Sequence, residues 1–589
     1  MSNTTPTAPV THQQYLRQWT KRVQETLAYR SVQGRTFSRL FNLMRTKRLA
    51  EAALDNVLEN TGAKTAGVDG VTKGDLADAQ SRTQLIEEIN RELCGRTYTS
   101  RPVRRVYIPK GNGEQRPLGI PTIKDRVVQE MLRLILEPIY EGRFYAHSYG
   151  FRPFRSTHHA AMRLKDLIGR RGYNIAIEGD IRKCFDRIHH LTLLRILRKT
   201  IHDERIIRII KDMLKAGVME DGVWQVTDEG TPQGGIISPL LANIYLNELD
   251  QYVAAKWDQI RKSEKERHLK HKSAIPCYIV RYADDFVILI KGTKEQGEQI
   301  KAEIAQFLEQ ELHLELSATK TLVTEVETGI DFLGFTIRKY PWATLITPSR
   351  KAMQKFRDKV KAKVWEGFAT DDIAGITRLN RFLIGWGMYY RRVSSSRHFT
   401  QGDHYVWWRV YRTTRRLHGV RVSTRRFFKA HYIPYRYDIR VKNRRHGGKN
   451  YGAWADAAHT RAHIVIRLAF LPIRYPRFYP QLNPYIPAER QELEKLVGTL
   501  EPPPDQLTEP IYKPGYGPEW STIRQEVLRA AGHRCAMCHQ HISSENAEVH
   551  HRTKLRDSNR RQANLLENLV ALCPMCHSKA ERGLQGISA

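Results

Sequence analysis

Two adjacent carboxylates mark the most informative segment of the chain, residues 278–290. Asp284 and Asp285 stand between two short apolar, β-branched runs, a pattern that predicts a strand, a tight turn and a second strand. Such a hairpin would hold both carboxylates at its tip. Like charges repel, so a pair fixed on a turn is suited to a cation, and Mg²⁺ takes carboxylate oxygens while sharing itself with phosphates. The alternative interpretation is a solvated Asp-Asp turn.

A third carboxylate, Asp180, follows the alternating segment 173–181 and is predicted to end a strand that faces the hairpin. Phosphoryl transfer with two metal ions needs carboxylates from more than one strand, so that one ion activates a 3′-hydroxyl and the other stabilises the leaving pyrophosphate. The alternative role of Asp180 is a helix N-cap. Between Asp180 and the hairpin lies a segment rich in glycine and proline, residues 230–239, where the backbone could approach a ligand closely.

A second set of reactive residues lies near the end of the sequence. Two Cys-x-x-Cys pairs have the composition of a closed tetrahedral Zn²⁺ site: Cys535 and Cys538, then Cys573 and Cys576. The segment between the pairs is longer than in a simple zinc ribbon and contains adjacent histidines at 550 and 551. The alternative is a zinc finger that only binds DNA.

The elements that must position these residues alternate between helix and strand up to about residue 340, which predicts an α+β fold with an antiparallel sheet. Apolar spacing further along, at residues 379–390, predicts a helical bundle. Prolines recur from 472 to 518 and indicate a linker, most clearly at 502–504. Earlier predicted elements are helices in 12–60, 126–141 and 191–215 and a hairpin in 101–125.

Composition points to a nucleic-acid partner. The chain has 589 residues, a formal net charge of +34 and 41% hydrophobic residues, which suits several folded domains and a polyanionic partner. Residues 401–450 hold fourteen Lys or Arg against two acids, interleaved with aromatics that could stack on bases. No apolar run approaches the roughly 20 residues of a membrane span. The polar start predicts no export, and we expect a cytoplasmic, nucleoid-associated or organellar protein without a membrane partner.

Taken in order, these segments resemble the reverse transcriptases encoded by mobile group II introns, also called maturases. The Tyr-Ala-Asp-Asp motif at 282–285 and the Thr-Pro-Gln-Gly-Gly motif at 231–235 carry the resemblance together with five further segments. These are residues 65–70, the Arg-Arg-Val-Tyr-Ile-Pro-Lys hairpin at 104–110, Ser-Tyr-Gly-Phe-Arg at 148–152, Asp-Phe-Leu-Gly-Phe at 331–335 and the thumb segment 383–390.

The resemblance implies a polymerase site with two Mg²⁺ ions held by Asp180, Asp284 and Asp285, of which Asp284 is expected to be the stronger ligand within the hairpin pair. It also implies a set of contacts to the incoming dNTP. Lys110 and Arg116 would contact the triphosphate, Phe185 would exclude a ribose 2′-hydroxyl, Gln233 would pack at the nucleotide pocket, and Lys320 would protonate the pyrophosphate. The alternatives are core packing for Phe185 and a plain surface lysine for Lys320.

The C-terminal segment resembles the His-Asn-His (HNH) endonucleases, in the version stapled by four cysteines. The resemblance implies that His551 is the general base, that His550 and His577 ligate one Mg²⁺ or Mn²⁺, and that Asn568 orients the base. Asn564 competes for the last role. The Gly-Gly usual between the histidine pair and the asparagine is absent, and residue 581, a histidine in some members, is glutamate.

These motifs together predict a multidomain α+β protein. We expect it to bind the intron RNA that encodes it, to assist splicing, and to cut target duplex DNA so that the freed 3′-hydroxyl primes reverse transcription. The alternatives are a splicing factor with an inactive polymerase fold, and a defence or retron-like reverse transcriptase. The expected domains are an N-terminal extension and start of the fingers (1–100), polymerase fingers and palm (101–345), a helical thumb or maturase domain (346–430), a basic DNA-binding region with the linker (431–515), and a small ββα-metal nuclease with the zinc site (516–589).

Overall fold

A computed structural model gives the fold of the chain. It divides into two compact units, Met1–Ser349 with Pro476–Leu500, and Arg350–Tyr475 with Glu501–Ala589, and each is described by itself. The structure describes residues 11–109, 115–220, 223–225, 230, 234–271, 273–369, 371–418, 422–441, 444–454, 462–477, 481–498, 520–543, 546–552 and 564–581.

The first unit begins with helices that pack around one central helix, α5 (Ile123–Glu141). Nearly every residue of α5 is buried. The buried residues therefore include polar side chains with hydrogen-bond partners as well as the apolar positions predicted from the sequence. One example is Asp125, which accepts a hydrogen bond from the hydroxyl of Tyr98 at 2.7 Å. The surrounding elements are α1 (His12–Val32), α2 (Phe41–Met44), α3 (Lys47–Glu59), η1 (Thr61–Lys64), η2 (Lys73–Leu76) and α4 (Ala79–Gly95).

The hairpin predicted in 101–125 is present as β1 (Val103–Pro109) and β2 (Gln115–Ile120), which pair antiparallel. They belong to a sheet of order β2-β1-β4-β5, completed by β4 (Val218–Glu220) and β5 (Val223–Gln225). The turn that joins β1 to β2 lies outside the described residues. The helical segment predicted at 191–215 is two helices, α7 (His190–Arg198) and α8 (Glu204–Lys215), and the side chain of Asp203 caps the second.

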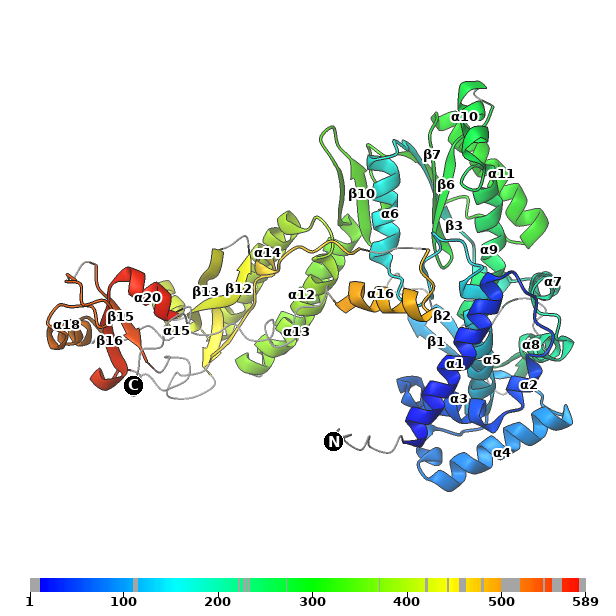
Figure 1. Cartoon of the computed structure of the whole chain (residues 1–589), viewed down its shortest axis with the longest axis horizontal. Coiled ribbons are helices and arrows are strands. Elements are labelled where there is room, and N and C mark those ends of the chain that lie inside the picture. Colours follow the sequence, from blue (N-terminus) through cyan, green and yellow to red (C-terminus); the bar gives the residue numbers. More distant parts are fainter. Residues whose placement is uncertain are drawn as a thin grey trace, which may run out of the picture. The chain divides into compact units, whose positions relative to one another are not determined.

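A four-stranded antiparallel sheet of order β6-β7-β3-β8 holds the predicted carboxylates. Helix α6 packs against β6 and β7, while α9 and α11 lie on the other side of the sheet (Figure 1). Because helices cover both faces, β6 and β7 are almost continuously apolar rather than alternating. The bounds are β3 (Ile175–Asp180), β6 (Cys277–Tyr282), β7 (Asp285–Ile290), β8 (Leu322–Glu325), α6 (Thr157–Gly169), η3 (Cys184–Arg187), α9 (Ser238–Lys256), α10 (Lys262–His271) and α11 (Lys294–Leu312).

A smaller antiparallel sheet, of order β11-β10-β9, follows in the same unit. Its first turn contains Leu333 and Gly334 with φ of 53° and 83°, so the Leu-Gly pair of the 331–335 motif makes the left-handed turn between β9 and β10. The unit ends with α16 (Pro487–Gly498), preceded by Tyr485, whose hydroxyl donates to Glu137 of α5 at 2.8 Å. The strands are β9 (Ile330–Phe332), β10 (Phe335–Lys339) and β11 (Thr344–Pro348).

The second unit begins with the helical bundle predicted for the thumb. Helices α12 (Arg350–Phe368) and α13 (Asp372–Tyr390) approach closely where Gly367 meets Gly375, and α14 (Ser396–His418) and α15 (Thr424–His431) follow. The region expected to be a basic DNA-binding segment after the thumb is folded here as a three-stranded sheet of order β12-β13-β14 that packs on α13, α14 and α15. Its elements are β12 (Tyr432–Val441), β13 (Arg444–Trp454), β14 (Ala462–Ile464) and η4 (Leu468–Phe470).

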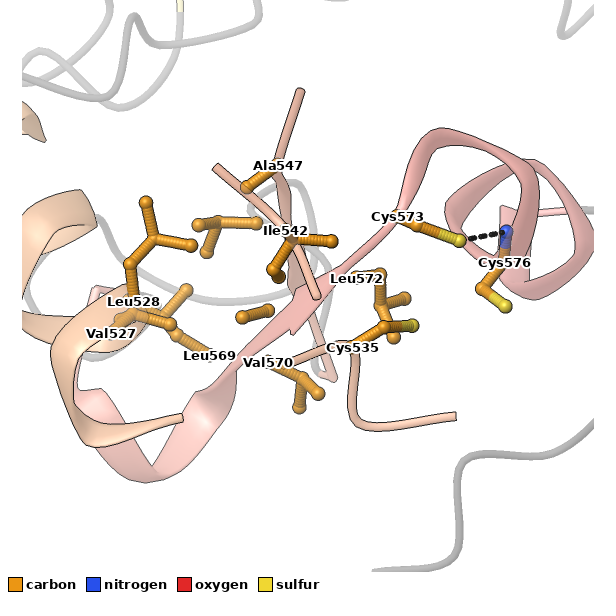
Figure 2. Close-up of a cluster of buried hydrophobic side chains, with 12 residues drawn as sticks. Val527, Leu528, Cys535, Ile542, Ala547, Leu569, Val570, Leu572, Cys573 and Cys576 are labelled. Atoms are coloured by element: carbon orange, nitrogen blue, oxygen red, sulfur yellow. Dashed lines mark hydrogen bonds between the residues drawn. The ribbon is translucent and has the colours of Figure 1, made fainter. Parts of the chain in front are cut away.

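The C-terminal module has the ββα arrangement that the sequence predicted, built from β15 (Glu548–His551), β16 (Leu569–Leu572) and α20 (Pro574–Glu581). Helix α18 (Trp520–Ala530) precedes it, and η5 (Leu566–Asn568) leads into β16. A small buried core joins α18 to the strands, and Figure 2 shows Cys535, Cys573 and Cys576 together at the end of this core opposite Val527 and Leu528. Within the described part of the chain, no helix combines the length and apolarity needed to cross a bilayer.

Candidate active sites

The structure brings the three predicted aspartates to one edge of the β6-β7-β3-β8 sheet. Strand β3 ends at Asp180, which pairs in register with Asp285 at the start of β7. Residues directly opposite on neighbouring strands share a face, so these two side chains lie on the same side of the sheet. Asp284 stands next to them in the two-residue turn between β6 and β7, where Ala283 has a φ of 57°.

A buried arginine fixes the shape of this turn. Arg281 has no exposed surface, and its Nη1 donates to the carbonyl of Ala283 at 2.8 Å and to Oδ1 of Asn243 at 2.9 Å. Its Nη2 donates to Oδ2 of Asp250 at 2.6 Å, which compensates the buried charge. Arg281 is not among the residues predicted from the sequence, although a charged residue inside an apolar strand was a visible signal.

The Ser-Tyr-Gly-Phe-Arg motif at 148–152 packs against the same turn. A Cβ on Gly150 would stand 2.3 Å from the backbone nitrogen of Ala283, so only glycine allows this approach. The amide of Tyr149 donates to the carbonyl of Arg281 at 2.8 Å, and Asn243 donates to the carbonyl of Gly150 at 2.8 Å. The backbone of the motif therefore packs against the turn that carries Asp284 and helps to hold it in place.

Burial and neighbouring charges raise the pKa of the two hairpin aspartates. Desolvation raises the pKa of Asp285 to about 6, and the charges of Asp284 and Asp180 add to the shift while Lys320 opposes it. Desolvation also raises the pKa of Asp284, with Asp180 adding and Arg116 and Arg281 opposing. This mutual repulsion is the electrostatic condition that a bound cation relieves.

A cationic side chain already lies at this cluster. Nζ of Lys320 is 3.1 Å from Oδ2 of Asp180, and the backbone carbonyl of Asp180 accepts from Ser317 at 2.8 Å. Lys320 therefore partly neutralises the acidic cluster.

The residues predicted to contact the nucleotide lie around this edge where the structure describes them. Arg116 is exposed on β2 of the hairpin, and its charge opposes the rise that burial causes in the pKa of Asp284. Phe185 is half-buried on η3 and meets the exposed ring of Phe151 edge to face at 6.2 Å. Lys110 and Gln233 lie outside the described residues.

Two glycines of the Gly-rich segment, Gly230 and Gly234, lie close to η3 and to β2, which flank the aspartate site. Gly230 has a φ of 94°, and a Cβ there would stand 2.9 Å from the carbonyl of Asp186, just past η3 residue Phe185. Gly234 has a φ of 122°, and a Cβ there would stand 2.6 Å from the carbonyl of Gly119 on β2. Glycine at these two positions therefore lets the backbone lie close to both η3 and β2.

The four cysteines predicted to bind zinc are gathered at one point. Their sulfur atoms all lie within 4.8 Å of one another, and the Sγ atoms of Cys538 and Cys573 are 3.8 Å apart. Tetrahedral Zn–S bonds of about 2.3 Å place sulfurs about 3.8 Å apart, so the four residues fit a structural Zn²⁺. Such an ion would tie the loop of Cys535 to the start of α20.

The histidines of the nuclease motif lie on β15 and α20. The rings of His550 and His577 have centroids 5.3 Å apart, so their nitrogens can reach one ion. His551 is buried, and burial lowers its pKa, which keeps the imidazole neutral and able to accept a proton at neutral pH.

The structure places Asn564, the competing residue, at the side chain of His551, with Oδ1 of Asn564 3.2 Å from Nε2 of His551. The backbone carbonyl of Asn568 accepts a hydrogen bond from the amide of Arg552, the residue after His551, at 2.8 Å. Both asparagines therefore lie beside the end of β15, and the role predicted for Asn568 stays a prediction.

Three segments of the chain match the models of known families. Residues 108–337 match the reverse transcriptase (RNA-dependent DNA polymerase) family, residues 353–432 match the group II intron maturase-specific domain, and residues 535–583 match the HNH endonuclease family. Each match encloses one of the sites or domains described above.

Individual relatives extend this picture. Protein YkfC of Escherichia coli is 42% identical over 307 residues, which cover 49% of this chain and 79% of that protein. The group II intron-encoded protein LtrA of Lactococcus lactis is 38% identical over 347 residues, which cover 51% of this chain and 57% of LtrA. An uncharacterised 91 kDa protein in the cob intron of Schizosaccharomyces pombe is 34% identical over 325 residues, covering 48% of this chain and 39% of that protein. The chain therefore belongs to the family of group II intron-encoded reverse transcriptases and maturases, in the form that carries an HNH endonuclease domain.

Proposed function

We propose that the protein synthesises DNA on an RNA template at Asp180, Asp284 and Asp285. The observation that carries this proposal is the register pairing of Asp180 with Asp285, next to Asp284 in a turn held by buried Arg281. Two Mg²⁺ ions bound there would activate the primer 3′-hydroxyl and stabilise the leaving pyrophosphate. The fit rests on three carboxylates gathered at one sheet edge, two of which have a pKa raised by burial and by neighbouring acidic charge, beside the cationic Lys320.

The surrounding side chains have roles suited to a nucleoside triphosphate. Arg116 on the fingers hairpin is placed to pair with phosphate oxygens, and Lys110 is assigned the same role by its position in the motif. Phe185 would block a ribose 2′-hydroxyl, and Gln233 would line the nucleotide pocket. Lys320, now paired with Asp180, would exchange that partner for the pyrophosphate when metal and substrate bind.

The second proposed activity is cleavage of target DNA by the C-terminal module. His551 would take a proton from water, with Asn564 holding its ring, while His550 and His577 would hold a Mg²⁺ or Mn²⁺ against the scissile phosphate. Zn²⁺ on the four cysteines would have a structural role only. The cut would release the 3′-hydroxyl that the polymerase extends.

The whole protein would then act as an intron-mobility enzyme and splicing factor. The maturase domain, for which we propose the limits 346–430, would bind intron RNA. The strands that follow it would contribute to binding target DNA. The net charge of +34 supports a nucleic-acid complex of this kind, since neutralised phosphates release counterions. An inactive polymerase kept only for splicing is disfavoured because all three aspartates are present and converge.

A pair of substitutions in the full-length protein tests both activities at once. Asp284→Ala should abolish primer extension on an RNA template with Mg²⁺, yet leave nicking of a target DNA duplex intact. His551→Ala should show the opposite pattern, since it leaves the polymerase residues untouched. Extension by Asp284→Ala, or nicking by His551→Ala at the wild-type rate, would contradict the corresponding assignment.

A further inference from the structure

A surface groove of about 820 Å³ lies on the second unit, formed by α14 together with Arg357 of α12. It belongs to neither the aspartate site nor the nuclease site. Its volume is within the roughly 300–1,000 Å³ of pockets that hold small ligands or single chemical groups of larger ones. Its residues are Arg357, Thr400, Gln401, His404, Tyr405, Trp408, Arg409 and Arg412.

The spacing of these residues along α14 explains why they share a wall. His404, Trp408 and Arg412 follow one another at intervals of four, so they form one row along the helix. Tyr405 and Arg409 form the adjacent row with the same interval. Two rows of one helix thus present aromatic and cationic groups to the same groove.

The aromatic element of the groove is held in place. Nε1 of Trp408 donates to Nε2 of His404 at 3.0 Å, and the guanidinium of Arg412 lies 5.5 Å from the centroid of the indole. Trp407 meets Trp408 edge to face at 5.1 Å and 87°. Although it is anchored in this way, Trp408 remains 40% exposed, which is unusual for so large an apolar side chain.

The groove is also tied to the neighbouring helix. The hydroxyl of Tyr405 donates to the backbone carbonyl of Arg357 at 3.3 Å, which links α14 to α12. An anchored wall loses little side-chain entropy when a ligand binds. The geometry is therefore that of a prepared binding surface rather than a set of mobile surface chains.

The charge of the groove selects an anionic ligand. Of the eight lining residues, three are arginine and none is acidic. Arginine suits phosphate because its planar fork donates two hydrogen bonds, and an exposed indole offers a face on which a base can stack. A phosphate joined to a flat ring is the chemistry of a nucleotide.

We propose that this groove binds an unpaired nucleotide of RNA, with its base stacked on Trp408 and its phosphates paired with Arg357, Arg409 and Arg412. A duplex is excluded because its bases are already stacked and cannot reach the indole. RNA is favoured over DNA because all eight residues lie within 353–432, the span that matches the maturase-specific domain. The inference rests on the proposed function of that domain in binding RNA.

Photocrosslinking on the full-length protein tests the site directly. The polymerase cleft is first occupied with a primer–template duplex, and a 12-nucleotide single-stranded RNA containing 5-iodouridine is then added and irradiated. Mass spectrometry should find the crosslink at Trp408. A blunt RNA duplex carrying the same label should not crosslink there. Absence of a Trp408 crosslink with the single strand would overturn the proposal, as would an equal yield from the duplex.

Affinity measurements with matched variants provide the second test. Trp408→Ala should weaken binding of the same RNA by about tenfold, because one base–aromatic stack is lost. Trp408→Phe keeps a stacking face and should bind within about threefold of wild type. Trp365→Ala removes a more exposed tryptophan of α12 outside the groove and should have no effect. Equal binding by Trp408→Ala and Trp365→Ala would overturn the assignment.

Two further arms separate this inference from the proposed function. A DNA strand of the same sequence that crosslinks to Trp408 in the same yield as RNA would show that the groove does not distinguish RNA from DNA, and would overturn the assignment of RNA as its ligand. Primer extension by the wild-type preparation is measured in parallel. If the wild type fails to extend a primer while Trp408 still crosslinks to RNA, the polymerase proposal falls and the groove stands.

Discussion

At the scale of single residues, the aspartate site depends on neighbours that carry no reactive group. Gly179 precedes Asp180 on β3 and faces Phe286, which follows Asp285 on β7. A Cβ on Gly179 would stand only 2.1 Å from Cζ of the buried Phe286 ring. The ring therefore lies directly on the glycine, and a larger residue at 179 would collide with it beside both aspartates.

Replacing this glycine should damage catalysis without removing a carboxylate. Gly179→Ala must push Phe286 aside, which we expect to cost about 1–3 kcal/mol of stability and to reduce primer extension at least tenfold, because both flanking aspartates shift. Steady-state extension rates and thermal unfolding measure the two effects.

The steric overlap also predicts that a second substitution, at Phe286, restores activity. Phe286→Val combined with Gly179→Ala should recover part of the extension rate, since the smaller side chain leaves room for the new methyl group. Gly62→Ala, where a Cβ would meet nothing within 4 Å, is the matched control and should behave like wild type. Failure of the double variant to improve on Gly179→Ala would show that the ring contact is not the cause.

At the scale of elements, the maturase helices are joined to the following segment by a buried carboxylate. Asp403, one of only two acids in 401–450, accepts hydrogen bonds from the amides of Leu468 at 2.7 Å and Ala469 at 2.9 Å, and so caps η4 onto α14. Burial raises the pKa of Asp403 to about 7, and the two amides and Arg467 oppose the shift. The carboxyl is thus easier to keep protonated in the folded protein than in the unfolded chain.

The pH dependence follows from that difference. Because the folded-state pKa lies above the ordinary value, the folded form holds an extra proton between about pH 4 and pH 7, and stability should fall as pH rises through this range, by up to about 1.4 kcal/mol per pH unit. Asp403→Asn cannot ionise, so the difference in unfolding free energy between wild type and variant should show this slope. Hydrogen exchange of peptides from α14 in urea, at several pH values, measures it, and a difference independent of pH would refute the account.

At the scale of the whole molecule, the two sets of candidate catalytic residues lie on different helices and strands. The aspartates that we propose for polymerisation lie on a sheet of the first unit, and the histidines that we propose for DNA cleavage lie on β15 and α20 of the second. The four cysteines join the two ends of the nuclease module, since two precede β15 and two flank the start of α20.

Removing zinc should therefore abolish DNA cleavage and leave DNA synthesis intact. After treatment with a chelator and return of Mg²⁺, we expect DNA nicking to be lost and primer extension to persist, because a structural zinc site contributes directly to folding of its own module. Metal analysis of the protein should show loss of zinc in step with nicking. Cys573→Ser should reproduce the effect, while Cys94→Ser, which changes an exposed cysteine of α4, should not. Parallel loss of both activities would mean that the parts are not independent.

The sequence by itself identified the residues that we propose for the chemistry and predicted the local elements that hold them. Adjacent aspartates between apolar runs, paired Cys-x-x-Cys motifs and the fingers hairpin are short-range patterns, and short-range patterns are written in residue type and spacing. Tertiary structure decided how distant segments meet. Register set Asp180 against Asp285, a turn brought Asn564 to His551, and the strands of the expected basic DNA-binding region packed onto the helices that precede them. The physical reason is that each of these contacts joins residues through packing and hydrogen bonds between separate elements, and local periodicity contains no information about which elements will be neighbours.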